Sequence, residues 1–251
     1  YTGTPITRSV VVTVNERTLK KGEDYELSYD NNTDVSTDEK PAQVTIKAKG
    51  NYAFEDVVKT FKITPKAIDA LSIEAYSTVY DGNEHAAVKW SDYVRDNYTL
   101  SFTDILNTQQ NDMESLNYAY SMDKCPTVKD VISDVYIYVK VERNNYTTKY
   151  LELRPQVRQA TPVVTNVQVI GKIYETTKNG EVKLTADTSC EGKLTLTGNQ
   201  DDLVISNATP GQSYNVSWVF TPTDSKNYCT KVDTLSILIS EDEVTSIELK
   251  Q

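Results

Sequence analysis

The sequence has few of the residues on which catalytic and metal sites depend. Among 251 residues there is one histidine, His85, and there are three cysteines. A second histidine is missing for a zinc site, and neither a Gly-x-Ser-x-Gly nor a His-Glu-x-x-His pattern occurs. Glycine accounts for only 9 residues and forms no phosphate-binding loop. We therefore expect a protein that is not an enzyme, with an exposed His85 and no catalytic residues, metal or other cofactor.

Basic charge and long apolar segments are also scarce. The chain carries 26 Lys and Arg residues against 36 Asp and Glu residues, a formal net charge of −10. This balance argues against nucleic acid as a partner, because phosphate backbones bind to a basic face. No apolar run approaches the roughly 18–20 residues that a membrane-spanning helix needs. The sequence predicts no membrane insertion within these residues.

Neither end of the sequence looks like a natural terminus. Residues 1–5 show none of the basic, apolar and small-residue regions of a secretory signal. Residues 244–251 begin the alternating pattern of a strand. We expect an excised part of a longer protein, so missing targeting signals carry no information about location.

Abundant β-branched and aromatic residues, including 17 tyrosines, indicate strands. The apolar alternation predicts strands at residues 10–14, 44–48, 135–141, 193–197 and 235–239. They are short and bounded by Gly, Pro, Asn and Asp, as in an antiparallel sandwich. The best helical candidate, at residues 112–120, is brief and lacks an apolar stripe. The fold class that we predict is all-β.

The sequence repeats itself. Tyr1-Thr2-Gly3 recurs as Tyr80-Asp81-Gly82, each followed by an apolar run, and an Asn-Tyr pair recurs before the last strand of three segments. These pairs are Asn51-Tyr52, Asn145-Tyr146 and Asn227-Tyr228. We interpret each pair as a structural corner, because Asn tolerates a left-handed turn and a Tyr ring can cover a sandwich end. The spacing predicts repeats at 1–65, 66–158 and 159–240, with a tail or further element at 241–251.

These motifs resemble the tandem immunoglobulin-like repeats of the MBG or YDG type, which occur in bacterial surface proteins and adhesins. The matching pieces are the two Tyr-x-Gly openings, Gly50-Asn51-Tyr52, the exit at 61–65 and the ending at 221–228. The resemblance implies small immunoglobulin-like antiparallel β-sandwich domains without catalytic residues. It also implies a monomeric, extracellular stalk or adhesin segment at a bacterial cell surface.

The sequence leaves two alternative functions open. The second repeat carries an insertion near 104–134, and loops of unusual length are often functional. Tyr118 and Tyr120 within it form a candidate recognition loop for a host glycan or matrix protein. The other alternative is an accessory module of a surface-anchored glycoside hydrolase whose catalytic domain lies elsewhere.

The cysteines and the acidic clusters offer further candidates. If the third repeat follows immunoglobulin topology, Cys190 and Cys229 lie in loops at one end of it, where a disulfide can form. Cys125 would then remain a free thiol. The acidic run at 30–34 alternates oxygen ligands as calcium loops do, but Asp and Asn also make solvated turns, which we favour.

Both tryptophans are predicted to lie in the core. Trp218 alternates with Val216 and Phe220 on one strand face, and Trp90 shares a face with Val88. This placement argues against a pair of exposed rings that stack on a sugar.

Overall fold

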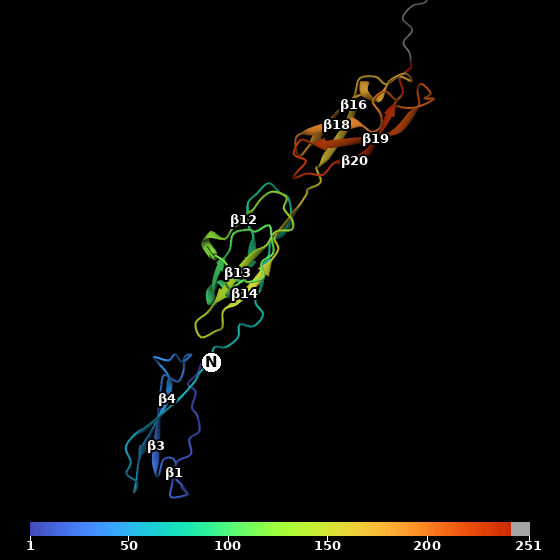
Figure 1. Cartoon of the computed structure of the whole chain (residues 1–251). Helices are drawn as coiled ribbons and strands as arrows, with labels where there is room; N and C mark the ends of the chain where they lie inside the picture. Colours follow the sequence, from blue (N-terminus) through green and yellow to red (C-terminus); the bar gives the residue numbers. More distant parts are fainter. Residues whose placement is uncertain (242–251) are drawn as a thin grey trace, which may run out of the picture. The chain divides into compact units, whose positions relative to one another are not determined.

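The structure is a computed structural model, and it describes residues 1–241 (Figure 1). Contacts between residues divide the chain into two compact units, each assembled from several stretches of chain. Unit 1 comprises Tyr1–Ala75, Val88–Pro126 and Tyr136–Leu153, and unit 2 comprises Tyr76–Ala87, Thr127–Val135 and the chain from Arg154 onward. Residues of the predicted second repeat occur in both units, and the division into three repeats stays a prediction.

Unit 1 is built almost entirely from strands. Its elements are β1 (Thr13–Val14), β2 (Arg17–Thr18), β3 (Tyr25–Asp30), β4 (Ala42–Ala48), β5 (Val57–Phe61), β6 (Ile73–Ala75), β9 (Val88–Trp90), α1 (Asp92–Asn97), β10 (Thr99–Phe102), β11 (Tyr120–Ser121), the 3-10 helix η1 (Met122–Lys124), β13 (Ile137–Glu142) and β14 (Lys149–Leu153). The antiparallel sheets run in the orders β3-β4-β5 and β11-β10-β13-β14, with two-stranded pairs β1-β2 and β6-β9.

Alternation along β4 explains how its sheet forms a core. Ala42, Val44 and Ile46 are buried, whereas Gln43 and Thr45 between them are only half-buried. Successive strand residues point to opposite faces, so one face of the sheet is apolar. Figure 1 shows β3 and β4 side by side, as their register requires.

The short helix α1 replaces the helical candidate at 112–120, which contains no α-helix. Ser91 begins α1 as its N-cap, with its Oγ accepting the backbone N–H of Val94 at 3.3 Å. Asp92 in the first turn suits the positive end of the helix dipole. α1 is the one α-helix within the described residues, so the all-β prediction is confirmed.

Unit 2 is also made of strands. Its elements are β7 (Ser77–Val79), β8 (His85–Ala86), β12 (Thr127–Val128), β15 (Gln156–Arg158), β16 (Val164–Ile170), the 3-10 helix η2 (Asn179–Glu181), β17 (Lys183–Thr188), β18 (Gly192–Leu196), β19 (Ser213–Pro222) and β20 (Lys231–Leu238). β19 pairs with β18 and β20, while β16 pairs with β17, all antiparallel (Figure 1). β7 pairs with β15 in parallel, and β8 pairs with β12.

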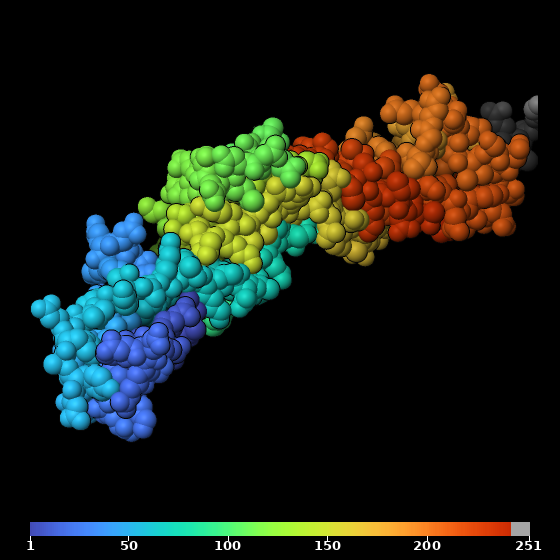
Figure 2. Space-filling model, turned by 60° about the horizontal axis from the view of Figure 1, so that its bottom comes forward, coloured from blue at the N-terminus to red at the C-terminus, as the bar shows by residue number. Residues whose placement is uncertain are grey.

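The two sheets β16-β17 and β18-β19-β20 enclose one apolar core. Trp218 (2% exposed), Val216 and Phe220 alternate along β19 and pack there with Ile237 and Ile239. A parallel bridge joins Ile173 to Ile239 at the edge of the sandwich. Figure 2 shows the surface of β19 and β20 in orange and red. This strand order is that of an immunoglobulin-like sandwich, as the sequence predicts.

Trp90 is half-buried and stacks on Phe102, with ring centroids 5.5 Å apart. Both tryptophans therefore serve packing, as the alternation predicts. None of the helices within residues 1–241 has the length and apolar character needed to cross a membrane.

Candidate functional site

Asn227, which lies between β19 and β20, is a buried polar side chain of unit 2 with several hydrogen bonds. It is only 5% exposed. Its Oδ1 accepts the backbone N–H of Val131 at 2.8 Å, and its Nδ2 donates to Asp130 at 3.2 Å and to Asp224 at 2.9 Å. The amide thus uses its oxygen and both of its N–H groups, as a buried amide must.

The backbone around Asn227 is hydrogen-bonded to Ala160, in the segment that follows β15. The Asn227 carbonyl accepts the N–H of Ala160 at 2.9 Å, and the N–H of Cys229 donates to the Ala160 carbonyl at 3.0 Å. The ring of Tyr228 meets Tyr80 edge to face, with centroids 5.4 Å apart. In the segment that leaves β15, Ala160 is therefore bonded to the two residues that flank Tyr228.

Unit 1 contains the same arrangement around Asn145. Its Oδ1 accepts the N–H of Val35 at 2.8 Å, and its Nδ2 donates to Asp34 at 2.7 Å. Its carbonyl accepts the N–H of Lys66 at 3.0 Å, and Thr147 donates to the Lys66 carbonyl at 2.9 Å. Each of these bonds has its counterpart at Asn227.

The tyrosine contacts correspond as well. Tyr1 and Tyr146 meet edge to face, with centroids 5.8 Å apart. The amino group of Tyr1 donates to the Thr64 carbonyl at 2.7 Å, just as the N–H of Tyr80 donates to the Arg158 carbonyl at 2.8 Å. The Tyr-x-Gly openings and the Asn-Tyr corners, which the sequence shows as separate motifs, are thus two halves of one contact.

We call this contact the Asn–Tyr joint. Its plug is the pair Asn145-Tyr146 in unit 1 and Asn227-Tyr228 in unit 2. Its socket is an Asp-Val pair together with the tyrosine of a Tyr-x-Gly opening. The socket of unit 1 consists of Asp34, Val35 and Tyr1. The socket of unit 2 consists of Asp130, Val131 and Tyr80. Both joints lie inside a unit, one in each.

A salt bridge adjoins the joint of unit 2. Lys226 Nζ lies 2.9 Å from Asp130 Oδ2. The hydrogen bonds from Lys226 and Asn227 lower the pKa of Asp130, because they stabilise its charged form. Burial raises the pKa of Tyr228. In the joint of unit 1, the guanidinium of Arg143 stands over the Tyr146 ring, 4.9 Å from its centroid.

A third position in the chain, at Thr209 and Pro210, corresponds to the two Asp-Val pairs but lacks their polar groups. The residue after each Asp-Val pair donates its backbone N–H to a carbonyl further along the chain: Ser36 to Ile63 at 3.1 Å and Ile132 to Val157 at 3.0 Å. Gly211 makes the equivalent hydrogen bond to the Ile239 carbonyl at 2.8 Å. The residues before Gly211 are Thr209 and Pro210. Proline has no N–H to donate, and threonine supplies no carboxylate, so this position lacks both polar groups of a socket.

The predicted reason for the Asn-Tyr corner is wrong at two of its three positions. Only Asn145 has a positive φ, 69°, whereas at the first corner Gly50 takes that conformation, with φ 68°. The asparagine amide bonds with the socket in both filled corners instead. An Asp-Val pair that precedes the penultimate strand at Asp34 and Asp130 is the sequence signal for this role.

The tyrosines of the candidate recognition loop are half-buried. Tyr118 donates to the Met113 carbonyl at 2.8 Å, and its ring lies 5.8 Å from that of Tyr150. Burial raises the pKa of Tyr118 to about 12. Tyr120 belongs to β11 and pairs with Phe102 on β10. These residues attach the insertion to its sheet.

The predicted disulfide is not present, because no two of the three cysteines are joined in the structure. Cys229 Sγ lies 3.4 Å from the Thr161 hydroxyl. The Cys190 thiol has its pKa raised by burial first and then by the charge of Asp224. The two cysteines do come from the loops that follow β17 and β19, as predicted.

His85 is half-buried rather than exposed. Its ring stacks on Tyr76 at 4.6 Å, and Nε2 lies 3.0 Å from the Asp81 carboxylate. The pKa of Asp81 falls to about 2 because of hydrogen bonds from the N–H of Asn83 and from His85. Across residues 1–241, no three His, Cys, Asp or Glu side chains are grouped to hold a metal ion. In the acidic run at 30–34, Asp34 bonds with Asn145 instead.

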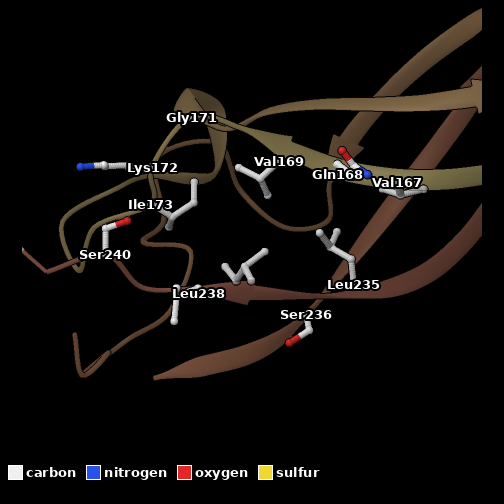
Figure 3. Close-up of a pocket in the computed structure, with 11 residues that line it drawn as sticks. Val167, Gln168, Val169, Gly171, Lys172, Ile173, Leu235, Ser236, Leu238 and Ser240 are labelled. Atoms are coloured by element: carbon white, nitrogen blue, oxygen red, sulfur yellow. The ribbon is translucent and has the colours of Figure 1, made fainter. Parts of the chain in front are cut away.

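An open groove of about 340 Å³ lies between β16 and β20. Figure 3 shows the residues that line it. Val169 and Ile173 line one side, and Leu235 and Leu238 line the other. Lys172 is the one charged residue among those that line it. This groove has the aliphatic character of a sandwich edge and holds no set of acid, base and nucleophile.

Comparison with known proteins adds little to this geometry. No protein-family model matches the sequence, and no curated protein matches it. Among solved structures, the N-terminal four Ig domains of Dscam1 isoform 9.44 align at 10% identity and a TM-score of 0.23. The alignment covers 80% of this chain and 58% of that chain. The immunoglobulin-like assignment therefore rests on strand order and register.

Proposed function

We propose that the chain is a non-catalytic stalk segment of a bacterial cell-surface protein, built from tandem immunoglobulin-like repeats of the MBG or YDG type. The observation that carries the proposal is the Asn–Tyr joint, which occurs twice with the same residues in the same roles. A spacer needs successive repeats to meet in a defined way, and a repeated joint meets that need.

The chemistry of the joint suits this function. A buried amide that must satisfy an oxygen and two N–H groups is costly to displace, because each unpaired group loses a hydrogen bond away from water. The edge-to-face tyrosines add apolar contact around the amide. A contact of this kind favours one arrangement of the Asn-Tyr pair relative to the Asp-Val pair and the opening tyrosine over other arrangements.

The structure favours the spacer over the recognition loop. Tyr118 and Tyr120 are half-buried against their own sheet, with the Tyr118 hydroxyl bonded to Met113. They present no cluster of free rings for stacking on a sugar. The insertion thus extends a sheet by one edge strand.

The test measures how narrowly the joint of unit 2 fixes the distance between the segments that it connects. Spin labels attached at the exposed positions 133 and 193 of unit 2 report a distance distribution by pulsed electron paramagnetic resonance, with the native cysteines replaced by serine. We expect a narrow distribution that broadens in the Asn227→Ala variant. Asn51→Ala, at a corner without a socket, is the matched control and should leave the distribution unchanged. A broad distribution before any substitution would contradict the proposal.

A further inference from the structure

β18 is an edge strand in the sandwich of unit 2. In the sheet β18-β19-β20 it pairs with β19 alone, along its whole length. Successive residues of an antiparallel strand direct their backbone N–H and C=O groups alternately toward the neighbouring strand and away from it. One side of β18 therefore presents backbone groups that no strand within residues 1–241 pairs with.

The hydrogen bonds at the two ends of β18 show which of its residues face outward. The N–H of Thr197 donates to the Ser217 carbonyl, and the N–H of Thr223 donates to the Glu191 carbonyl, both at 2.9 Å. The odd-numbered residues of 191–197 thus bond with β19. The backbone groups of the residues between them point to the open edge, where Leu194, at the centre of β18, makes no hydrogen bond within the described part of the chain.

A groove of about 470 Å³ lies beside this edge, between β18 and the strand β17 of the other sheet. Leu184 of β17 and both leucines of β18, Leu194 and Leu196, line it. Leu196 is buried, and the other two are partly buried against the core of unit 2. Every second side chain of a strand added to β18 would therefore extend an existing apolar core.

The charged residues that line the groove are both lysines, Lys183 and Lys193. They are exposed, and neither of them forms an ion pair or a side-chain hydrogen bond within residues 1–241. Two uncompensated lysines in a chain of net charge −10 mark this edge as locally basic. They repel basic segments and a second copy of the same edge, and they attract a segment that carries carboxylates.

We propose that β18 binds an extended, acidic segment of a partner protein by strand addition. The backbone of the segment pairs with the open edge at Leu194. On one face of the added strand the side chains are apolar and enter the groove beside Leu194 and Leu196, and on the other face they are acidic and lie beside Lys193. The partner is thus recognised by an alternation of Asp or Glu with Val, Ile or Leu.

This site goes beyond the proposed function and does not depend on the Asn–Tyr joint. The joint of unit 2 uses residues 130–131, Tyr80 and the Asn227-Tyr228 pair, none of which lines the groove. A spacer with such an edge would hold a partner along its side.

The experiment uses the full chain and a fluorescein-labelled peptide, Glu-Val-Glu-Val-Glu-Val-Glu, whose binding is followed by fluorescence anisotropy. We expect saturable binding. A peptide with lysine in place of each glutamate should bind at least about tenfold more weakly, because the lysines of the groove repel it. A peptide with proline in place of the central valine should lose affinity as well, because proline interrupts the backbone ladder.

Charge reversal locates the site. Lys183→Glu combined with Lys193→Glu should weaken the binding of the acidic peptide by about tenfold, because two attractions become repulsions. The matched control combines Lys21→Glu with Lys62→Glu in unit 1, which changes the net charge equally and should alter the affinity by no more than about twofold. All four side chains are exposed, so both variants should keep the far-ultraviolet circular dichroism of the parent chain.

Amide hydrogen exchange of the full chain, measured by nuclear magnetic resonance with and without saturating peptide, identifies the binding mode. The N–H of Leu194 should exchange about tenfold or more slowly with the peptide bound, because pairing removes it from water. The amides of β20, the other edge of the same sheet, should exchange as before.

Four outcomes would overturn the inference. The first is no saturable binding of the acidic peptide. The second is an equal loss of affinity in the two charge-reversed variants, which would reduce the binding to attraction by net charge. The third is binding without protection of Leu194, which would exclude strand addition. The fourth is a Leu194 N–H that becomes protected without peptide as the chain dimerises in sedimentation, which would make a second copy the occupant of the edge.

Discussion

The amide oxygen of Asn227 accepts the backbone N–H of Val131, a residue 96 positions earlier in the chain, at 2.8 Å. Asn145 holds Val35 in the same way across 110 positions, also at 2.8 Å. Two asparagines that look like turn residues therefore make long-range contacts. The stability of both units should depend on them.

Replacing Asn227 by alanine should destabilise unit 2 by about 1–3 kcal/mol, because the N–H of Val131 is left without its acceptor. Urea unfolding of the full chain measures this change. Asn51→Ala is the control and should alter the free energy of unfolding by no more than about 0.5 kcal/mol, as an exposed substitution does. Equal effects of the two substitutions would show that the socket contributes nothing.

Acid should weaken the joint of unit 2 through Asp130. The pKa of this carboxyl is lowered in the folded state by the hydrogen bonds of Lys226 and Asn227. A folded-state pKa below the unfolded one contributes stability at pH values above the ordinary pKa of about 3.9, and the contribution is lost as pH falls through the folded value.

The measurement is the thermal midpoint between about pH 2 and pH 6, compared with Asp130→Asn. The variant should show a shallower decline of the midpoint over this range. Superimposable pH profiles would mean that Asp130 titrates alike in the folded and unfolded chains.

Trp218 should tolerate phenylalanine far better than alanine. Its ring is buried at the centre of β19, and its indole N–H has no hydrogen-bond partner within residues 1–241. Trp218→Ala leaves a cavity and should cost about 3–5 kcal/mol. Trp218→Phe removes a polar group that makes no bond and should cost much less, measured by the same unfolding assay. A cost equal to that of alanine would mean that the N–H has a partner in solution.

The thiols should be free and unequal in reactivity. The intact mass of the protein purified without reductant should correspond to three reduced cysteines. Cys190 should alkylate more slowly at pH 8 than an exposed cysteine, because its raised pKa lowers the thiolate fraction. Unfolding in urea should remove the difference. A mass lower by two hydrogens would instead show that two of the three cysteines form a disulfide.

Much of the fold could be predicted because strand formation depends on the alternation of apolar and polar residues that are close in the sequence. The period of two along 44–48 and along Val216, Trp218 and Phe220 places one set of side chains inside, whatever the neighbours are. Short strands bounded by turn residues then indicate a sandwich. The helix at Asp92–Asn97 escaped prediction because a serine cap and six residues are too brief for a periodic signal.

The candidate site could be predicted only in its parts. The Tyr-x-Gly openings and the Asn-Tyr corners are visible as repeats, but their local roles, a turn and a covering ring, account for both without any contact between them. Nothing local links Asn227 to Asp130, since the two are 97 positions apart. The burial of Tyr118 likewise depends on Tyr150, which a different strand supplies.

By itself the sequence determined that this protein is made of β-strands, that its Tyr-x-Gly and Asn-Tyr motifs recur, and that its cores include Trp218 and the valines of alternating strands. These properties follow from side-chain size and period, which act between residues close in the chain. The tertiary structure alone decided which repeated motifs meet and that the cysteines remain apart. Those outcomes depend on hydrogen-bond geometry between distant segments, which folding brings within reach and no local pattern specifies.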